Sequence, residues 1–247
     1  MDNSSYVSLS SSMALRRKLA VAANNMANAN SAGFKSEHAR FEEYLHGQGT
    51  GRDKVSFVID KASYMDTRQG GLTQTSNPLD IALQGEGWLG YEGEGGQTVF
   101  GRDGRMSINA QGDLVTVDGS PVLSAGGAPI GIPMDAGTIS ISSDGVISDQ
   151  GGNQIATIGV FSVDDIQGYD RLGNGKFAAP EELGQPPLVA EPNTRVAQGF
   201  VEQSNVEPIT EMTKLMEVQR AYQRSSKLAE NVDDLRKRTI QTLGRKQ

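Results

Sequence analysis

Two glycine-containing stretches have spacings that could bind phosphate groups. Gly85 to Gly90 matches the dinucleotide-binding pattern G-x-G-x-x-G, in which a helix begins beside the pyrophosphate. No helix-forming stretch follows it here, and Glu86 and Trp88 would repel or crowd a pyrophosphate. A second stretch, residues 170–177, has aspartate where a phosphate loop has its first glycine and phenylalanine where it has the hydroxyl residue that holds magnesium. Neither stretch predicts a nucleotide site.

The residue types of metal-dependent and nucleophilic enzymes are scarce. The chain has no cysteine, and its two histidines, His38 and His46, have no acidic residues of metal-ligand spacing near them. Acidic residues are numerous, so a carboxylate pair that hydrolyses a glycan stays open as an alternative, although no pair stands out. The sequence therefore predicts no catalytic, cofactor-binding or metal site, and it favours a protein that is not an enzyme.

Glycine and charge divide the 247 residues into two ends and a middle. Of the 30 glycines, 28 lie between residues 47 and 199, whereas residues 1–32 and 209–243 contain neither glycine nor proline. Because these two residues interrupt helices, both ends are predicted to be helical. The ends are basic, with a charge of +3 over residues 1–40 and +4 over residues 208–247. The remainder carries −14, which gives the chain its net charge of −7.

The N-terminal stretch has two adjacent apolar seams at helical spacing. One is Leu15, Leu19, Ala22 and Met26. The other, interrupted by Arg16, is Tyr6, Leu9, Met13, Ala20, Ala23 and Ala27. Two seams make the apolar surface wider than the single stripe of a two-stranded coiled coil, so this helix is expected to contact more than one neighbour.

The C-terminal stretch has a start signal and one imperfect apolar seam. Pro208 suits a first helical turn, and Ser204 and Asn205 are capping candidates just before it. The apolar members of the seam include Leu215, Val218, Tyr222 and Val232. As one helix, residues 208–243 would be about 54 Å long, longer than a compact domain of this size could cover.

The middle of the chain reads as short strands. Turn signals such as Asp118-Gly119 and Asp144-Gly145 separate β-branched runs at intervals of 8 to 12 residues, which favours an antiparallel barrel, a sandwich or an irregular β fold over a parallel α/β fold. Residues 34–76 are less regular; Phe41–Leu45 could form a helical turn, and Val55–Ile59 a strand. The predicted fold class is α+β, with terminal helices that pair into a coiled-coil-like helical domain and a central glycine-rich all-β domain.

The terminal helices carry more apolar surface than one pairing can cover. An isolated amphipathic helix is marginal in water, so each end is expected to pack first on the other and then on further copies or related chains. The alternative is that both helices fold back over the β domain. The predicted assembly interface consists of Leu9, Met13, Leu15, Leu19, Met26, Met212, Leu215, Val218, Tyr222 and Val232.

Three segments resemble the flagellar rod and hook proteins. Residues 23–35, ANNMANANSAGFK, are similar to the family's signature A-N-N-x-A-N-x-x-T-x-G-F-K, with Ser31 in place of the threonine. Residues 199–206, GFVEQSNV, resemble its C-terminal signature, and residues 76–83 and 100–104 resemble the entry to its β domain. The motif positions are Asn24, Asn25, Asn28, Gly33, Phe34, Lys35, Ser204, Asn205 and Val206.

This resemblance implies an axial structural protein of the flagellar basal body. It implies the proximal rod, with the distal rod as the alternative, and terminal helices that pair into an inner layer around a hollow tube that transmits torque. The expected domains are a helix over residues 1–33, an extended connector over 34–76, a β domain over 77–198, and a strand or linker and long helix over 199–247. Asparagines near the end of the first helix are expected to cap it or to bind a neighbour's backbone, and Gly33 is expected at a positive φ.

The resemblance also implies partners and a location. The partners would be other rod proteins, further copies of this chain and the flagellar type III export apparatus, and the location a rod that crosses the periplasm, reached without a cleaved signal peptide. Nucleic acid is not expected, because basic residues are not interleaved with aromatic ones, and neither is membrane insertion, because no apolar run approaches ~20 residues. A glycan-active enzyme and a secreted β-domain binding module stay as alternatives.

Overall fold

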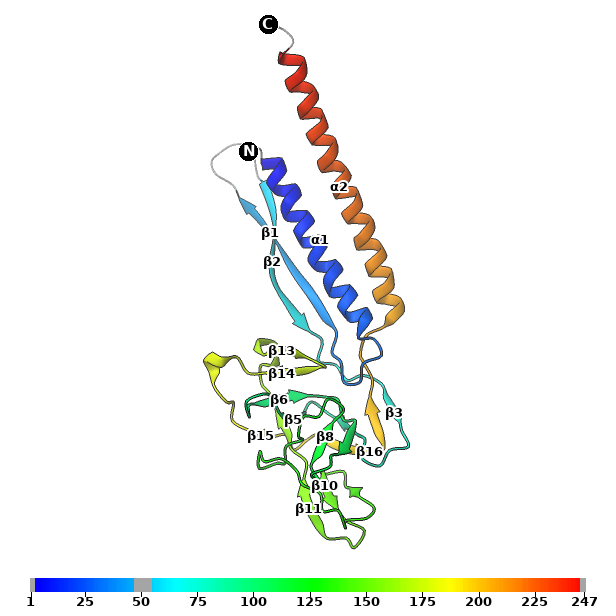
Figure 1. Ribbon diagram of the computed structural model, residues 1–247. Coiled ribbons are helices and arrows are strands. Elements are labelled where there is room, and N and C mark those ends of the chain that lie inside the picture. Colours follow the sequence, from blue (N-terminus) through cyan, green and yellow to red (C-terminus); the bar gives the residue numbers. More distant parts are fainter. Residues whose placement is uncertain (1–2, 47–54, 245–247) are drawn as a thin grey trace. The chain divides into compact units, whose positions relative to one another are not determined.

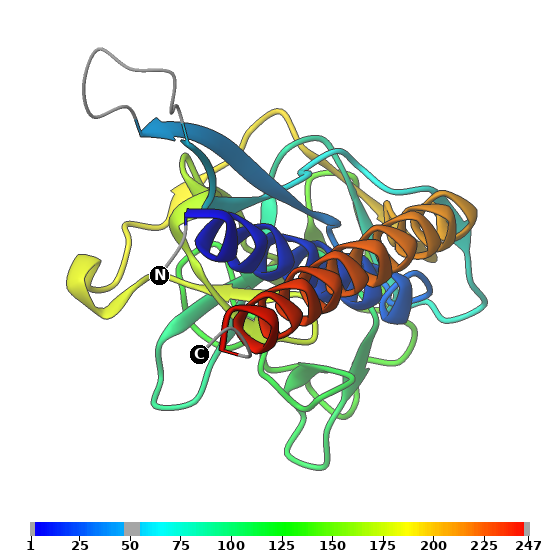
Figure 2. The ribbon, with the colours of Figure 1, turned by 90° about the horizontal axis from the view of Figure 1, so that it is seen from above.

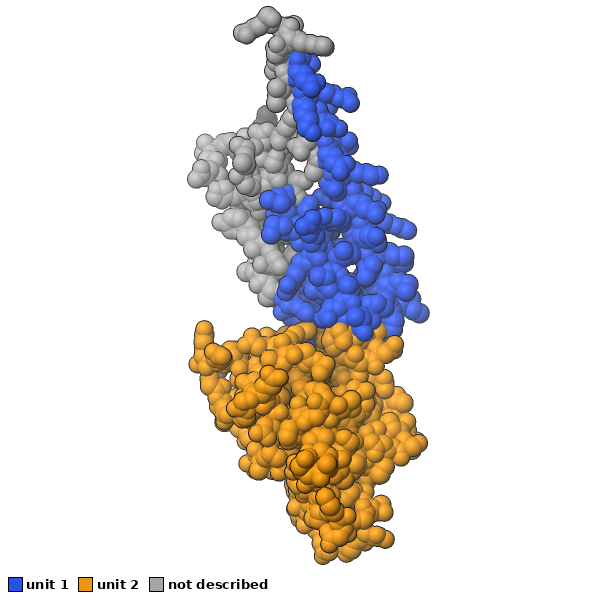
Figure 3. Space-filling view, viewed as in Figure 1, with its two compact units in different colours: residues 1–27, 37–65, 207–247 blue, residues 28–36, 66–206 orange. Residues whose placement is uncertain are grey.

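The computed structural model describes residues 3–46 and 55–244, and the chain divides into two compact units (Figure 1). Unit 1 consists of Met1–Ala27, Glu37–Met65 and Glu207–Gln247, and unit 2 of Asn28–Ser36 and Asp66–Val206 (Figure 3). Terminal helices and a β-rich middle confirm the predicted α+β class. The expected connector, residues 34–76, supplies residues to both units.

The N-terminal helix α1 spans Asn3–Ala27 and ends six residues before the expected limit at residue 33. A turn follows it, because the amide of Ser31 donates to the carbonyl of Asn28 and the Ser31 hydroxyl donates to the Asn28 side chain. The chain thus leaves the helix before it reaches Gly33.

A long hairpin packs against α1 in unit 1. Strands β1 (Glu37–His46) and β2 (Val55–Met65) pair antiparallel, with one register shift between Arg40 and Phe41. The helical turn expected at Phe41–Leu45 is wrong, since these residues pair with β2 and cross-strand pairing overrides a weak local preference. The hairpin and the C-terminal helix flank α1 on different sides (Figure 2).

The C-terminal helix α2 spans Pro208–Gly244, and Pro208 occupies its first turn as predicted. The cap is Glu207, whose carbonyl accepts from the amide of Glu211 and whose carboxylate accepts from the Thr210 hydroxyl. The capping role expected for Ser204 and Asn205 is wrong, because Ser204 accepts from Val206 and Asn205 binds other segments of unit 2. Neither α1 nor α2, over its described length, is apolar enough to cross a membrane.

Unit 2 contains the other strands, and their pairings are antiparallel as predicted. Its largest sheet has the order β13-β14-β6-β5-β12-β15, a smaller one the order β11-β10-β9, and β16-β4, β17-β3 and β7-β8 form pairs. Their bounds are β3 Leu72–Gln74, β4 Ile81–Gln84, β5 Trp88–Glu92, β6 Thr98–Gly101, β7 Met106–Ile108, β8 Leu114–Thr116, β9 Ser140–Ile141, β10 Val146–Ser148, β11 Gln154–Thr157, β12 Val160–Ser162, β13 Asp170–Gly173, β14 Lys176–Ala178, β15 Val189–Ala190, β16 Arg195–Gln198 and β17 Phe200–Glu202.

The core of unit 2 is aliphatic with a few aromatic side chains. Ile81, Leu89 and Ile147 are fully buried in one cluster. Tyr91 is also buried and donates its hydroxyl proton to the carbonyl of Asp103, so its polar end is satisfied. The single tryptophan, Trp88, packs edge-on against Phe177 and provides a fluorescent reporter of this unit.

Gly33 meets a steric requirement in unit 2. Its φ is +67°, as predicted, and a Cβ placed on it would lie 2.4 Å from the carbonyl carbon of Arg102. Both the backbone conformation and the close approach of two main chains therefore require glycine at this position.

We expect Gly33→Ala to destabilise unit 2 by more than the about 1–2 kcal/mol that a left-handed alanine costs, because the backbone near Arg102 must also move. Gly119→Ala is the matched control, since Gly119 has a φ of +86° and open space around the added methyl group. Denaturant unfolding followed by Trp88 fluorescence measures both. Equal losses of stability would show that the close approach at Gly33 is unimportant.

Candidate assembly surface

The two terminal helices of unit 1 lie side by side and antiparallel. Asn25 contacts Glu211, Arg16 donates to the Tyr222 hydroxyl at 2.8 Å, and the hydroxyls of Ser12 and Ser225 are 3.3 Å apart. In this register the start of α1 lies level with about residue 234, so the last ten or so residues of α2, about 15 Å, extend past it. The expectation that α2 is too long to be covered within one chain is confirmed for this pairing.

The predicted interface positions fall into two sets. Leu9, Met13 and Met212 have exposed fractions of 57%, 63% and 55%. The half-buried positions are Leu15, Leu19, Met26, Leu215, Val218 and Tyr222. Val232 lies within α2, but its side chain is outside the described part of the structure. Large apolar side chains thus remain exposed beside a helix pair that is already formed.

The second seam of α1 is exposed over its described length. Ala20, Ala23 and Ala27 are exposed together with Leu9 and Met13. The opposite side of α1 is buried at Ala14 and Val21, near the hairpin. An exposed apolar stripe beside a packed face, as seen over the described residues, is typical of a surface that contacts another chain.

Asn25 joins α1 to the start of β1 and to α2. The side chain is 1% exposed; its amide nitrogen donates to the carbonyl of Glu37 at 2.8 Å, and its oxygen accepts from the amide of Glu37 at 2.9 Å. The nitrogen also lies 3.4 Å from a carboxylate oxygen of Glu211. A motif asparagine therefore binds backbone at this position, that of β1 in its own chain.

In unit 2 the N-terminal and C-terminal motifs meet at a buried ion cluster, defined as Lys35, Arg102 and Glu202. The Lys35 Nζ donates to Glu202 Oε1 at 2.6 Å and to the carbonyl of Arg68 at 2.8 Å. Arg102 lies 3.3 Å from the other oxygen of Glu202. Glu202 therefore compensates two buried cations, and either cation alone can balance its charge.

The cluster holds more positive than negative charge. Burial lowers the pKa of Lys35, and the charge and hydrogen bond of Glu202 oppose that shift. Burial also lowers the pKa of Arg102, whose guanidinium lies 5.1 Å from the centre of the Trp88 ring and donates to the carbonyl of Gly85. An arginine stays protonated in proteins, so Arg102 supplies the permanent charge that Glu202 must balance.

Asn205 connects three segments around this cluster. Its side-chain oxygen accepts from the amide of Ser36 at 2.7 Å, and its nitrogen donates to the carbonyls of Asp66 and Arg68. The main-chain amide of Asn205 donates to the carbonyl of Phe34. One asparagine thus fixes residues 34–36 and 66–68 beside the chain that leads to α2.

The remaining motif residues have less direct roles. Phe34 and Val206 are buried, Asn28 accepts from the Ser31 hydroxyl, and Asn24 is exposed. Sequence reasoning did not single out Arg102 and Glu202 as site residues. The signal that could have identified them is their position inside two family-like segments, residues 100–104 and 199–206. Charged residues are almost never buried without a partner, so opposite charges in two such segments could have been expected to pair.

A metal site requires several histidine, cysteine or acidic side chains close together. Over the described residues, no group of three or more histidine, cysteine or acidic side chains could hold a metal ion. The described ends of the chain form two antiparallel helices with an exposed apolar stripe, joined in sequence to an antiparallel β unit.

Comparisons with known proteins show the class of protein to which this chain belongs. Residues 6–35 match the family model "Flagella basal body rod protein", residues 82–149 the "Flagellar hook protein FlgE/F/G D1 domain", and residues 197–242 the "Flagellar basal body rod FlgEFG protein C-terminal". The chain is 39% identical to the flagellar basal-body rod protein FlgF of Mesorhizobium japonicum over the full length of both chains.

Two further similar proteins are also flagellar rod proteins. FlgF of Rhizobium meliloti is 38% identical over 99% of both chains, and the rod protein FlgG of Agrobacterium fabrum is 31% identical over 90% of this chain and 92% of its own. The chain belongs to the flagellar basal-body rod protein family, and within it resembles FlgF. This family is structural, and the glycan-active enzyme is not favoured.

We expect Glu202→Gln to lower the free energy of unfolding of unit 2 by about 3–5 kcal/mol, because it leaves Lys35 and Arg102 buried without a counter-charge. Lys35→Met is the matched control and should cost less, since Glu202 keeps Arg102. Denaturant unfolding monitored through Trp88 separates the two. A loss at Lys35→Met as large as that at Glu202→Gln would contradict the assignment of Glu202 as the centre of the cluster.

Proposed function

We propose that this chain is a structural subunit of the proximal part of the flagellar basal-body rod. In this proposal the helices α1 and α2 pack in coiled-coil fashion with those of neighbouring subunits to form a hollow tube that transmits torque and leaves a path for export. Other rod proteins, including further copies of this chain, are the partners. The chain reaches the rod through the flagellar type III export apparatus and lies where the rod crosses the periplasm.

The observation that carries the proposal is the exposed stripe of α1. Met13 exposes 63% of its surface and Leu9 57%, although α1 already contacts both α2 and the hairpin. At about 25 cal/mol per Å² of apolar surface removed from water, covering such side chains favours association. Full-length similarity to FlgF supports the proximal rod over the distal rod, since the FlgG relative is less similar.

Met13→Asp tests this function. We expect the variant to keep its helicity and the unfolding transition of unit 2, because Met13 is exposed, but to fail to enter basal bodies and to abolish swimming, because a carboxylate would be buried in the subunit contact. The measurement is the amount of the chain in purified basal bodies, together with motility in a strain that lacks the native gene.

Met134→Asp is the matched control, since Met134 is 87% exposed but lies in unit 2. It should leave incorporation and motility unchanged. Motile cells with normal amounts of the Met13→Asp chain in their basal bodies would overturn the role of this stripe. A strain that builds complete rods without any copy of the chain would overturn the proposed function itself.

A further inference from the structure

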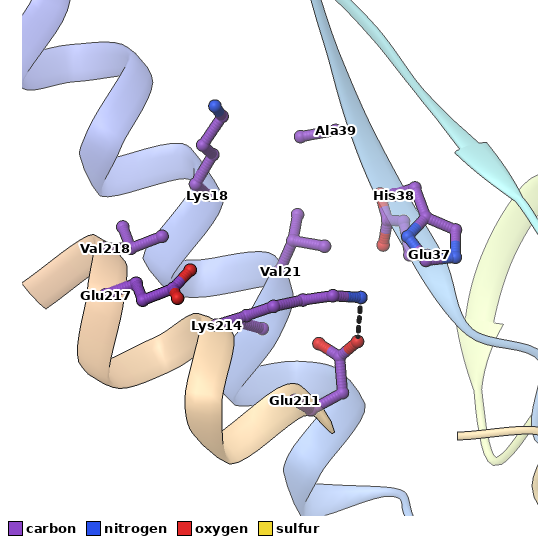
Figure 4. A pocket seen from close by; sticks show the side chains of 10 residues that line it. Lys18, Val21, Glu37, His38, Ala39, Glu211, Lys214, Glu217 and Val218 are labelled. Atoms are coloured by element: carbon purple, nitrogen blue, oxygen red, sulfur yellow. Dashed lines mark hydrogen bonds and ion pairs between the residues drawn. The ribbon is translucent and has the colours of Figure 1, made fainter. Parts of the chain in front are cut away.

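A pocket of about 260 Å³ opens in unit 1 between α1, α2 and β1 (Figure 4). Val21 and Ala22 of α1 and Val218 of α2 give it an apolar lining, and Lys18, Lys214 and Glu217 are charged residues around it. This volume is below the ~300–1,000 Å³ of most small-molecule sites, and it suits one or two protein side chains.

The charges around the pocket are not balanced. Lys214 is paired with Glu211 at 2.7 Å, so that cation is already neutralised. Glu37, His38 and Lys18 also line the pocket, and Glu37 and Lys18 have interactions of their own. Glu217 is exposed and forms no ion pair within the described residues (Figure 4). An apolar pocket beside an unpaired carboxylate fits an apolar side chain that is accompanied by a cation.

The same helix carries this combination on its other side. Met216 is 45% exposed, and Arg220, one turn further along α2, is exposed and forms no ion pair within the described residues. Successive residues of a helix are separated by about 100°, so Met216 lies about 160° from both Lys214 and Val218, which face the pocket. Met216 therefore cannot enter the pocket of its own chain.

We propose that the pocket between α1, α2 and β1 receives Met216 from α2 of a second copy of this chain, with Arg220 of that copy paired to Glu217. Met216 lies at the level of the pocket but on the opposite side of α2 from Lys214 and Val218, and Arg220 lies about 120–160° from these two residues and about 60° from Glu217. One copy can thus fill the pocket of the next while its own pocket stays open to a third. The unbranched, flexible side chain of methionine adapts well to a pocket of irregular shape.

This inference specifies one contact within the proposed rod and rests on that function. Charge complementarity selects the second copy, because the unpaired carboxylate and the unpaired guanidinium occur on the same chain beside the pocket and the methionine. The contact is heterologous, since the two surfaces differ, and such contacts build rings or helical filaments rather than closed pairs.

The absence of cysteine from the sequence makes a direct cross-linking test possible. Two differently tagged full-length chains, one with Val21→Cys and one with Met216→Cys, are produced together in a strain that lacks the native gene. After mild oxidation of purified basal bodies, we expect a disulfide-linked species that carries both tags. The control pair replaces Met216→Cys by Leu228→Cys, which is 64% exposed on the same helix but points elsewhere, and should give at least tenfold less product.

A charge exchange tests the ion pair separately. Glu217→Arg in the Val21→Cys chain should reduce the cross-link severalfold, and Arg220→Glu in the Met216→Cys chain should then restore it, because the two reversed charges meet across the contact. Since both positions are exposed, neither change should alter helicity or the unfolding of the purified chain.

Each outcome bears on a distinct claim. If both chains are present in basal bodies but no species carries both tags, or if each cysteine links only to another rod protein, the contact between copies is overturned and the rod function stands. If neither chain enters basal bodies although both fold, the proposed function fails. The contact is then tested by oxidising the two purified chains together at high concentration. A cross-link above the level of the Leu228→Cys control pair supports the contact, and no cross-link above that level overturns it.

Discussion

The burial of one carboxylate organises unit 2. Glu202 accepts hydrogen bonds from Lys35 and from the amide of Gly70, and it faces Arg102. These partners come from segments more than 30 residues apart, so the burial of one carboxylate brings distant parts of the chain together. Its own main-chain carbonyl accepts from the amide of Gly33, which draws the N-terminal motif to the strand that carries Glu202. Because the carboxylate is desolvated, losing it leaves both cations unbalanced, whereas losing one cation leaves the other in place.

The helices of unit 1, unlike the core of unit 2, keep large apolar side chains exposed. Their pairing includes the contacts of Asn25 with Glu211 and of Arg16 with Tyr222, and it leaves Leu9, Met13 and Met212 in contact with solvent. A helix pair with these exposed side chains gains stability when another chain covers them, because most helical stability in water comes from packing. Unit 2 has a closed core and unit 1 has an open one, which suits a subunit that completes its packing only in an assembly.

The sequence predicted the elements better than their bounds and their partners. The lack of glycine and proline identified both helices, and the glycine positions identified an antiparallel β unit, because these signals are local. The end of α1 at Ala27 and the cap at Glu207 were missed, since they depend on where the side chains of Asn28, Ser204 and Asn205 find partners. The strand expected at Val55–Ile59 lies in β2, but its pairing with β1 was missed for a similar reason, because Phe41–Leu45 has no strong preference of its own and the partner strand decides its conformation.

In the candidate site, too, features that depend on local sequence could be predicted, and features that depend on distant segments could not. The exposed stripe on α1 could be predicted, because an interrupted second seam at helical spacing is visible in the residues themselves. The ion cluster and the pocket could not, since both require knowing which residues from separate segments come together. The pocket and the exposed Met216 occupy opposite sides of a single helix, and no rotation of that helix within one chain could bring them together. In the proposed contact, each copy offers Met216 to the pocket of the next, so the contact repeats from subunit to subunit, as heterologous contacts in rings and helical filaments do.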